Sequence, residues 1–282
     1  MKNMQNKKIS LAYSPCPNDT FIFYPLIRNL IDTGGYKFCE ALKDVENLNK
    51  EAFENIHNIT KLSFAALGHL QDKYALLKSG AALGRGCGPL IVANEGFNID
   101  DIQKNKIAVP GIFTTANLLL SLFLNETPTV EFLSFEQIMP AVSSGKFNYG
   151  VIIHEGRFTY QQYGLKALVD LGKWWEDKTN LPIPLGGIAV DRDFGKNKAE
   201  EFEKIIKASV EYGFANRLHS YDYIKKHAQE IDDEVIKSHI NLYVNNFTLD
   251  IGEEGEKAIN TLFDAARAKG IMPKSDFPLF IT

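Results

Sequence analysis

The feature of this sequence that most constrains its fold is the alternation of short apolar runs with segments of helical spacing. Ile9–Tyr13 and Ile59–Ser63 have the length and composition of strands, and helical segments follow them at Phe21–Ile31 and Phe64–Asp72. Strands that alternate with helices in this way are typical of α/β proteins with mostly parallel sheets. We therefore predict an α/β fold in which helices flank each sheet.

Two extended segments divide the chain. Pro89–Ala93 predicts a strand that leaves the first set of strands, and the proline-containing run Leu181–Val190 predicts a strand that returns. The pattern then becomes helical, as in Ala199–His219 and Glu253–Lys269. We predict a larger discontinuous lobe of residues 1–88 and 194–282, a smaller inserted lobe of residues 89–193, and a ligand cleft between them.

Composition and charge exclude several classes of partner. The chain has 31 lysine and arginine residues against 35 aspartates and glutamates, and its net charge of −4 lacks the basic character that nucleic acids require. The longest apolar run, near Leu118–Leu124, is too short to span a bilayer. We expect a small-molecule partner, with no nucleic acid and no membrane insertion, and the oligomeric state stays open.

Cysteine usage and the first residues bear on the compartment. The three cysteines are widely spaced and form no CxxC pair, so the sequence predicts neither a disulfide framework nor a zinc site. The lysines among residues 1–10 lead into no apolar segment of the kind found in signal peptides. We expect a cytoplasmic protein with reduced thiols and no bound metal.

Polar residues gather where predicted strands give way to helices. Such junctions lie at Ser14–Thr20, Lys61–Ser63, Gly84–Gly86, Thr114–Asn117 and His154–Arg157. Ligands of α/β sheets bind at the carboxyl ends of strands, so we expect these junctions at the cleft.

The last junction offers a catalytic base. A buried strand ends directly before His154, whose imidazole suits proton transfer near neutral pH, although a histidine that ends a core strand can also be purely structural. Glu155 can orient that imidazole or face solvent. Thr114 and Thr115 open either an anion site at a helix start or an ordinary N-cap. Lys61 is either an anion contact or a solvated lysine.

Several motifs resemble those of the 1,4-dihydroxy-6-naphthoate synthase family. They are SPCPNDTF at Ser14–Phe21, TKLS at Thr60–Ser63, GRGCGP at Gly84–Pro89, VPG and TTA between Val109 and Ala116, IIHE and RFTY between Ile152 and Tyr160, DLG at Asp170–Gly172, LPIPLG at Leu181–Gly186 and GEEGE at Gly252–Glu256. The resemblance runs in order over nearly the whole chain.

This resemblance implies the type II periplasmic-binding-protein fold, used as an enzyme of the futalosine route to menaquinone. It implies a carbon–carbon lyase that converts cyclic dehypoxanthinylfutalosine to 1,4-dihydroxy-6-naphthoate without a cofactor or metal. His154 would be the proton acceptor. By position, the residues that line the substrate site would be Lys61, Leu62, Ser63, Thr115 and Ala116. From the strand–helix junctions we add Asn18, Arg85 and Thr114 as expected substrate-binding residues. Either Lys61 or the amides of residues 114–116 would hold the substrate carboxylate.

Two other functions are compatible with the same fold. A non-catalytic solute-binding protein would share it, but we expect no export of this chain. A chorismate dehydratase of the same pathway would share it too, but the SPCPNDT motif does not resemble that enzyme. Fold alone does not decide among the three.

Overall fold

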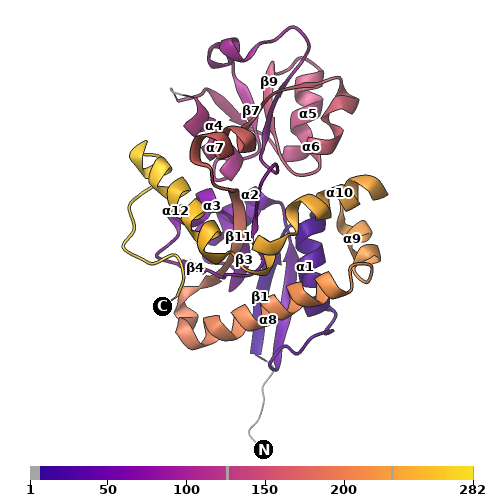
Figure 1. Ribbon diagram of the computed structural model, residues 1–282, viewed down its shortest axis with the longest axis vertical. Helices are drawn as coiled ribbons and strands as arrows, with labels where there is room; N and C mark the ends of the chain where they lie inside the picture. The colour runs from indigo at the N-terminus through magenta and orange to yellow at the C-terminus, as the bar shows by residue number, and fades with distance from the viewer. Residues whose placement is uncertain (1–6, 125–126, 230–231, 282) are drawn as a thin grey trace, which may run out of the picture.

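The computed structural model describes residues 7–124, 127–229 and 232–281, which form two lobes, each built on one β-sheet (Figure 1). The first sheet has the order β2-β1-β3-β11-β4, and β5 also pairs with β11. Its strands are β1 (Lys7–Tyr13), β2 (Tyr36–Leu42), β3 (Ile59–Ser63), β4 (Tyr74–Leu76), β5 (Ala82–Gly84) and β11 (Ile183–Asp191). The second sheet has the order β10-β6-β9-β7-β8. Its strands are β6 (Leu90–Ala93), β7 (Ile107–Val109), β8 (Val130–Phe132), β9 (Tyr149–Ile152) and β10 (Lys166–Asp170).

Both sheets are mixed, whereas the alternation of strands and helices predicts mostly parallel ones. β1 is parallel to β2 and β3, but β11 is antiparallel to β3, β4 and β5. In the second sheet β7 is parallel to β8 and β9, and β6 is antiparallel to β9 and β10. The antiparallel pairs include the two strands next to the crossings, β6 and β11. The sequence pattern does not record the direction in which such a strand enters a sheet.

The return crossing comes earlier in the chain than the predicted lobe limit. β11 pairs with strands of the first sheet, although the sequence analysis assigned residues 183–191 to the inserted lobe. β6 to β10 together make the second sheet, as an inserted lobe requires. The exact limits of the two lobes stay a prediction.

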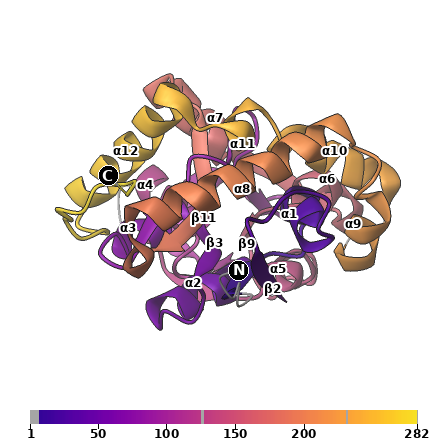
Figure 2. The same ribbon diagram turned by 90° about the horizontal axis from the view of Figure 1, so that it is seen from below.

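Helices cover both faces of each sheet (Figures 1 and 2). They are α1 (Pro17–Ile27), α2 (Val45–Phe53), α3 (Phe64–His69), α4 (Thr115–Phe123), α5 (Phe135–Ser143), α6 (Gly156–Thr159), α7 (Leu171–Thr179), α8 (Gly195–Ala215), α9 (Tyr221–His227), α10 (Asp233–Tyr243), α11 (Asn246–Leu249) and α12 (Gly252–Ala268). Short 3₁₀ turns lie at η1 (Ile99–Lys104), η2 (Tyr160–Tyr163) and η3 (Arg192–Phe194). Within the described residues, no helix is both long and apolar enough to cross a membrane.

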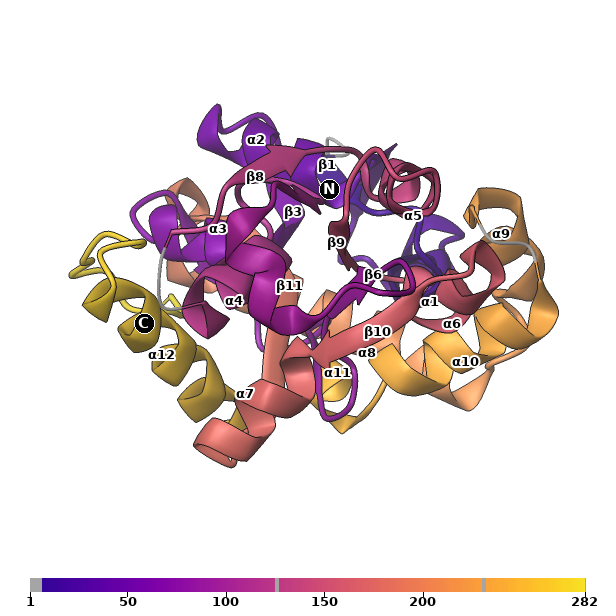
Figure 3. The same cartoon turned by 90° about the horizontal axis from the view of Figure 1, so that it is seen from above.

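The strand alternation of the second sheet explains its two cores. Neighbouring residues of a strand point to opposite faces. Val151 therefore packs in the cluster that contains Leu119 of α4, and Ile152 packs in the cluster that contains Ile138 of α5. Figure 3 shows α4 and α5 on the two sides of this lobe. The α4 cluster continues into the first lobe through residues such as Leu62, so one apolar core joins the lobes at their base.

Candidate active site

A cavity lies between the lobes, next to the ends of β3 and β9. Eight of the nine residues that the sequence analysis names as site residues line it. They are Asn18, Lys61, Leu62, Ser63, Thr114, Thr115, Ala116 and His154. Ser14, Asp19, Cys87, Ile153, Leu185 and Tyr243 are among the other lining residues. The first lobe supplies the loop before α1 and the end of β3, and the second lobe supplies the start of α4 and the residues after β9.

Arg85 is the exception. Its guanidinium is exposed and binds the carboxylate of Glu254 at 2.8 Å and the carbonyl of Asn180 at 3.2 Å. Arg85 does not line the cavity, and we remove it from the proposed site. The glycine-rich segment around Arg85 instead allows two chain segments to approach closely. A Cβ on Gly88 would lie 2.3 Å from the backbone of Gly172, a distance that only glycine allows.

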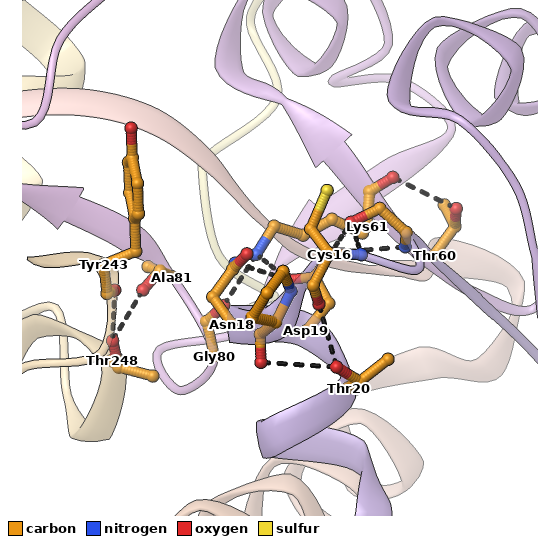
Figure 4. A network of polar contacts seen from close by, with 12 residues as sticks. Cys16, Asn18, Asp19, Thr20, Thr60, Lys61, Gly80, Ala81, Tyr243 and Thr248 are labelled. Carbon is orange, nitrogen blue, oxygen red and sulfur yellow. Dashed lines mark hydrogen bonds and ion pairs between the residues drawn. The ribbon is translucent and has the colours of Figure 1, made fainter. Parts of the chain in front are cut away.

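Lys61 and Asp19 form a buried ion pair in the wall of the cavity (Figure 4). Lys61 Nζ donates to Asp19 Oδ1 at 2.7 Å and to the carbonyl of Gly80 at 3.2 Å. Asp19 Oδ1 also accepts from Asn18 Nδ2 at 2.8 Å, and its Oδ2 accepts from the hydroxyl of Ser14 at 2.8 Å. Buried charges need such pairing. Lys61 is therefore neither solvated nor an uncompensated positive charge.

The predicted start of α1 is wrong. The sequence pattern predicts a helix from about Phe21. The helix begins instead at Pro17, with Cys16 in the N-cap position, because proline suits the first helical position. Asn18 and Asp19 therefore lie in the first turn of the helix, and their side chains take part in the ion-pair network with Lys61.

His239 of α10 extends this network. Asn18 Nδ2 donates to Asp19, so Asn18 Oδ1 faces His239 and accepts from its Nε2 at 2.9 Å. His239 is fully buried, and burial first, then the neighbouring His154 and Lys61, holds its pKa well below the ordinary histidine value. The ring is therefore neutral, with its proton on Nε2.

His154 directly follows the short extended run after β9 and adopts a left-handed conformation, with φ of 55°. Among the described residues, the other non-glycine residues with positive φ are all asparagines, which tolerate this region well. The ring of His154 is edge-on to the ring of Phe135, with ring centres 5.1 Å apart. It is nearly parallel to the ring of His239, with ring centres 6.4 Å apart. A strained backbone held by packing on several sides is common at functional sites.

The two nitrogens of His154 have different surroundings. Nδ1 lies 3.5 Å from Cys16 Sγ, and Nε2 is buried and has no hydrogen-bond partner in the described part of the chain. Cys16 is buried, and this burial, together with the charge of Glu155, raises the pKa of its thiol well above the ordinary value. Cys16 is therefore a neutral thiol.

Glu155 is also buried, with 6% of its surface exposed, so it does not face solvent. Its Oε2 lies 4.0 Å from Nδ1 of His239. Cys16, His154 and Glu155 each offer one possible metal-ligand atom, and these three atoms lie within 4.8 Å of one another. Among the described residues, this group is the candidate metal site. A metal would need the Cys16 thiolate, which the raised pKa disfavours.

The start of α4 brings backbone N–H groups to the cavity. Thr114 is the N-cap, and its Oγ1 accepts from the N–H of Asn117 at 3.2 Å. Thr115 Oγ1 donates to the carbonyl of Leu185 at 2.7 Å and so ties α4 to β11. The N–H groups of Thr115 and Ala116 lie in the first turn and have no acceptor within the helix. They can bind an anionic group of a ligand.

Ser63 faces the cavity from the other lobe. Its Oγ accepts from Asn49 Nδ2 at 3.1 Å, so its own hydroxyl proton is directed elsewhere. Tyr243 was missed as a site residue, because the helical pattern places it on the buried stripe of α10. That placement is correct, yet the end of this stripe reaches the cavity. Trp174 and Trp175, which are neighbours in the sequence, do not line the cavity, and Trp175 Nε1 donates to the carbonyl of Pro182 at 3.2 Å.

Comparison with known proteins decides the family. A family model described as menaquinone biosynthesis matches residues 9–268. The chain belongs to this family. Two enzymes named 1,4-dihydroxy-6-naphthoate synthase are similar to it over nearly their whole length. The one from Thermus thermophilus is 45% identical and covers 97% of this chain and 99% of its own. The one from Streptomyces coelicolor is 40% identical and covers 96% of each chain.

Solved structures confirm the predicted two-lobed fold for this member of the menaquinone biosynthesis family. A protein from Archaeoglobus fulgidus is 34% identical, with a TM-score of 0.88 over 96% of this chain and 100% of its own. The ligand-binding component of an ABC-type import system from Staphylococcus aureus is 14% identical, with a TM-score of 0.71 over 98% of this chain and 96% of its own. At that identity the likeness shows the fold alone, which is that of periplasmic binding proteins.

Proposed function

We propose that this chain is a carbon–carbon lyase that converts cyclic dehypoxanthinylfutalosine to 1,4-dihydroxy-6-naphthoate in menaquinone biosynthesis. The observation that carries the proposal is the near full-length similarity, at 45% and 40% identity, to two enzymes named for that product. The cavity between the lobes supports it, because it combines a histidine with groups suited to an anionic substrate. The protein would act in the cytoplasm on a small-molecule substrate.

His154 is the proposed general base. The reaction begins when Nε2 accepts a proton from a carbon next to a carbonyl of the substrate. The electron pair left behind allows the spiro ring to open and a C–C bond to break, and the product gains an aromatic ring. This step needs one positioned base and neither a redox cofactor nor a metal. His154 lines the cavity, and its Nε2 has no partner in the described part of the protein.

The substrate carboxylate is best placed at the start of α4. Lys61 Nζ already binds Asp19 and Gly80, so its charge is largely compensated. The N–H groups of Thr115 and Ala116 and the hydroxyl of Ser63 are not committed in this way. Backbone N–H groups at a helix start bind carboxylates through both hydrogen bonds and the helix dipole. Lys61 then acts by fixing Asp19 and the loop before α1.

The two lobes are proposed to open and close around the substrate. Ligand-driven hinge closure is common in this architecture. Several hydrogen bonds join the lobes in the present state, such as Asn49 Nδ2 to the carbonyl of Phe113 at 3.2 Å and the backbone N–H of Ile112 to Glu46 at 3.1 Å. We propose that these contacts break when the cavity opens.

One incubation tests the function against its alternatives. Purified protein is mixed with cyclic dehypoxanthinylfutalosine, and formation of 1,4-dihydroxy-6-naphthoate is followed by absorbance and mass spectrometry. Catalytic turnover supports the lyase. Stoichiometric binding with no product would instead indicate a solute-binding protein. Conversion of chorismate, supplied in a parallel incubation, would identify the dehydratase.

A further inference from the structure

Cys16 and His154 meet across the boundary between the lobes. Cys16 lies between β1 and α1 in the first lobe, and His154 follows β9 in the second. The contact joins Cys16 Sγ to His154 Nδ1 at 3.5 Å, within the range for a hydrogen bond that involves sulfur. Residues 138 positions apart in the sequence therefore form a polar contact beside the proposed base.

The thiol is presented by a rigid segment. The backbone N–H of Cys16 donates to Ser14 Oγ at 3.4 Å, and Ser14 in turn donates to Asp19. The carbonyl of Cys16 accepts from the N–H and the hydroxyl of Thr20, each at 3.0 Å. Because Asp19 is itself held by Lys61, the ion pair of the cavity wall fixes where the sulfur lies. Figure 4 shows the sulfur of Cys16 projecting from this network.

The protonation of His154 depends on what Nδ1 binds. A neutral imidazole carries one proton, and its other nitrogen is the base. We propose that Cys16 is a positioning residue, whose sulfur accepts the Nδ1 proton of His154 and so leaves the lone pair on Nε2. This proposal rests on His154 acting as the base of the proposed function. A thiol that donated to Nδ1 would place the ring proton on Nε2, and that nitrogen could no longer accept a proton.

Cys16 gives the ring a neutral partner at Nδ1. A carboxylate in that position would add electrostatic stabilisation of the protonated ring, whereas a neutral acceptor fixes the tautomer alone. The titratable groups that face the ring are Cys16 from the start of α1, His239 from α10 and Glu155 from its own turn, with Phe135 of α5 as an apolar neighbour. Burial keeps both Cys16 and His239 uncharged. The sulfur can therefore orient the ring without adding a charge.

The contact also depends on the arrangement of the lobes. Since its two residues belong to different lobes, an opening of the cavity would separate Sγ from Nδ1. The contact therefore holds His154 in its working tautomer whenever the lobes are closed, as they are in this structure. Closure of the lobes around the substrate is thereby linked to the tautomer of His154 that leaves the lone pair on Nε2.

Two variants of Cys16 test the proposal by kinetics. Cys16→Ala removes the acceptor, and we expect kcat to fall about tenfold or more, with KM within about twofold of wild type. Cys16→Ser keeps a small acceptor, and we expect it to recover most of the lost kcat. Cys39→Ser, at an exposed position on β2, serves as the control and should behave as wild type. A Cys16→Ala enzyme with unchanged kcat and pH–rate profile would overturn the proposal.

A second measurement needs no substrate turnover. Nitrogen-15 NMR of labelled histidine distinguishes the two neutral tautomers, and His154→Gln assigns the signal among the six histidines. We expect the Nδ1–H form in the wild-type protein and a shift towards the Nε2–H form in Cys16→Ala. An Nε2–H form in the wild-type protein would contradict the proposal. If the wild-type protein forms no naphthoate, the proposed function fails, while the NMR result still reports on the Cys16 contact.

Discussion

Asp19 and Lys61 are joined by a 2.7 Å contact between Oδ1 and Nζ, with almost none of either side chain exposed to solvent. The pair connects α1 to β3 and fixes the loop that carries Ser14 and Cys16. A buried pair of this kind contributes little net stability when intact, but the loss of one partner leaves the other charge without compensation. Its main effect is on the geometry of the cavity.

The first prediction concerns this pair. Lys61→Met should lower the free energy of unfolding by about 3–5 kcal/mol, because it leaves the Asp19 carboxylate buried and unpaired. The double variant Asp19→Asn with Lys61→Met should lose clearly less than the sum of the two single variants. Urea unfolding of the four proteins measures both effects. Additive losses would show that the two side chains do not act as a pair.

A second prediction follows from the lowered pKa of His239. An unfolded histidine titrates at about 6.5, and the folded value is lower, so between the two values the unfolded state binds more protons. The contribution of His239 is therefore complete above about pH 6.5, and stability falls as pH drops below that value, by at most about 1.4 kcal/mol per pH unit.

Urea unfolding between pH 7.5 and pH 5 measures this dependence. His239→Gln removes the titrating group and should flatten the curve below about pH 6.5. His219→Gln is the control, because His219 is exposed and should leave the curve unchanged. Equal slopes in wild type and His239→Gln would assign the acid sensitivity to another group.

A third prediction concerns the close approach of Gly88 and Gly172. An alanine Cβ at residue 88 would lie 2.3 Å from the backbone of Gly172, which has no side chain that can move away. Gly88→Ala should lower stability by about 1–3 kcal/mol, as other overpacked sites do. Gly156→Ala is the control for stability, since its Cβ would meet neighbours at no less than 3.5 Å. Equal melting temperatures for the two variants would refute the steric account.

Local patterns predict much of the fold because they report local preferences. The limits of β3 match the predicted strand Ile59–Ser63 to the residue, since this is a short apolar segment with clear boundaries. The start of α1 was wrong for the opposite reason. Asp19 forms its ion pair with Lys61, which lies 42 residues further along the chain. No pattern around residue 19 records that contact.

The candidate site, too, was predicted only where local patterns determine it. Strand ends with polar residues indicated where His154 and Thr114 would lie, because the carboxyl ends of strands meet at a cleft. The pairing of Cys16 with His154 and of Asn18 with His239 comes from tertiary packing alone. Arg85 was included because it lies in a polar, glycine-rich junction, but Glu254 binds its guanidinium away from the cavity.

The measurement that tests the central claim most directly is the turnover of cyclic dehypoxanthinylfutalosine by His154→Asn, beside its affinity for the same compound. Asparagine nearly matches the size of the ring but cannot accept the proton. The account predicts a kcat lower by about 10²–10⁴-fold, with the folded structure and the dissociation constant of the substrate little changed. A turnover within about tenfold of wild type would contradict the assignment of His154 as the base.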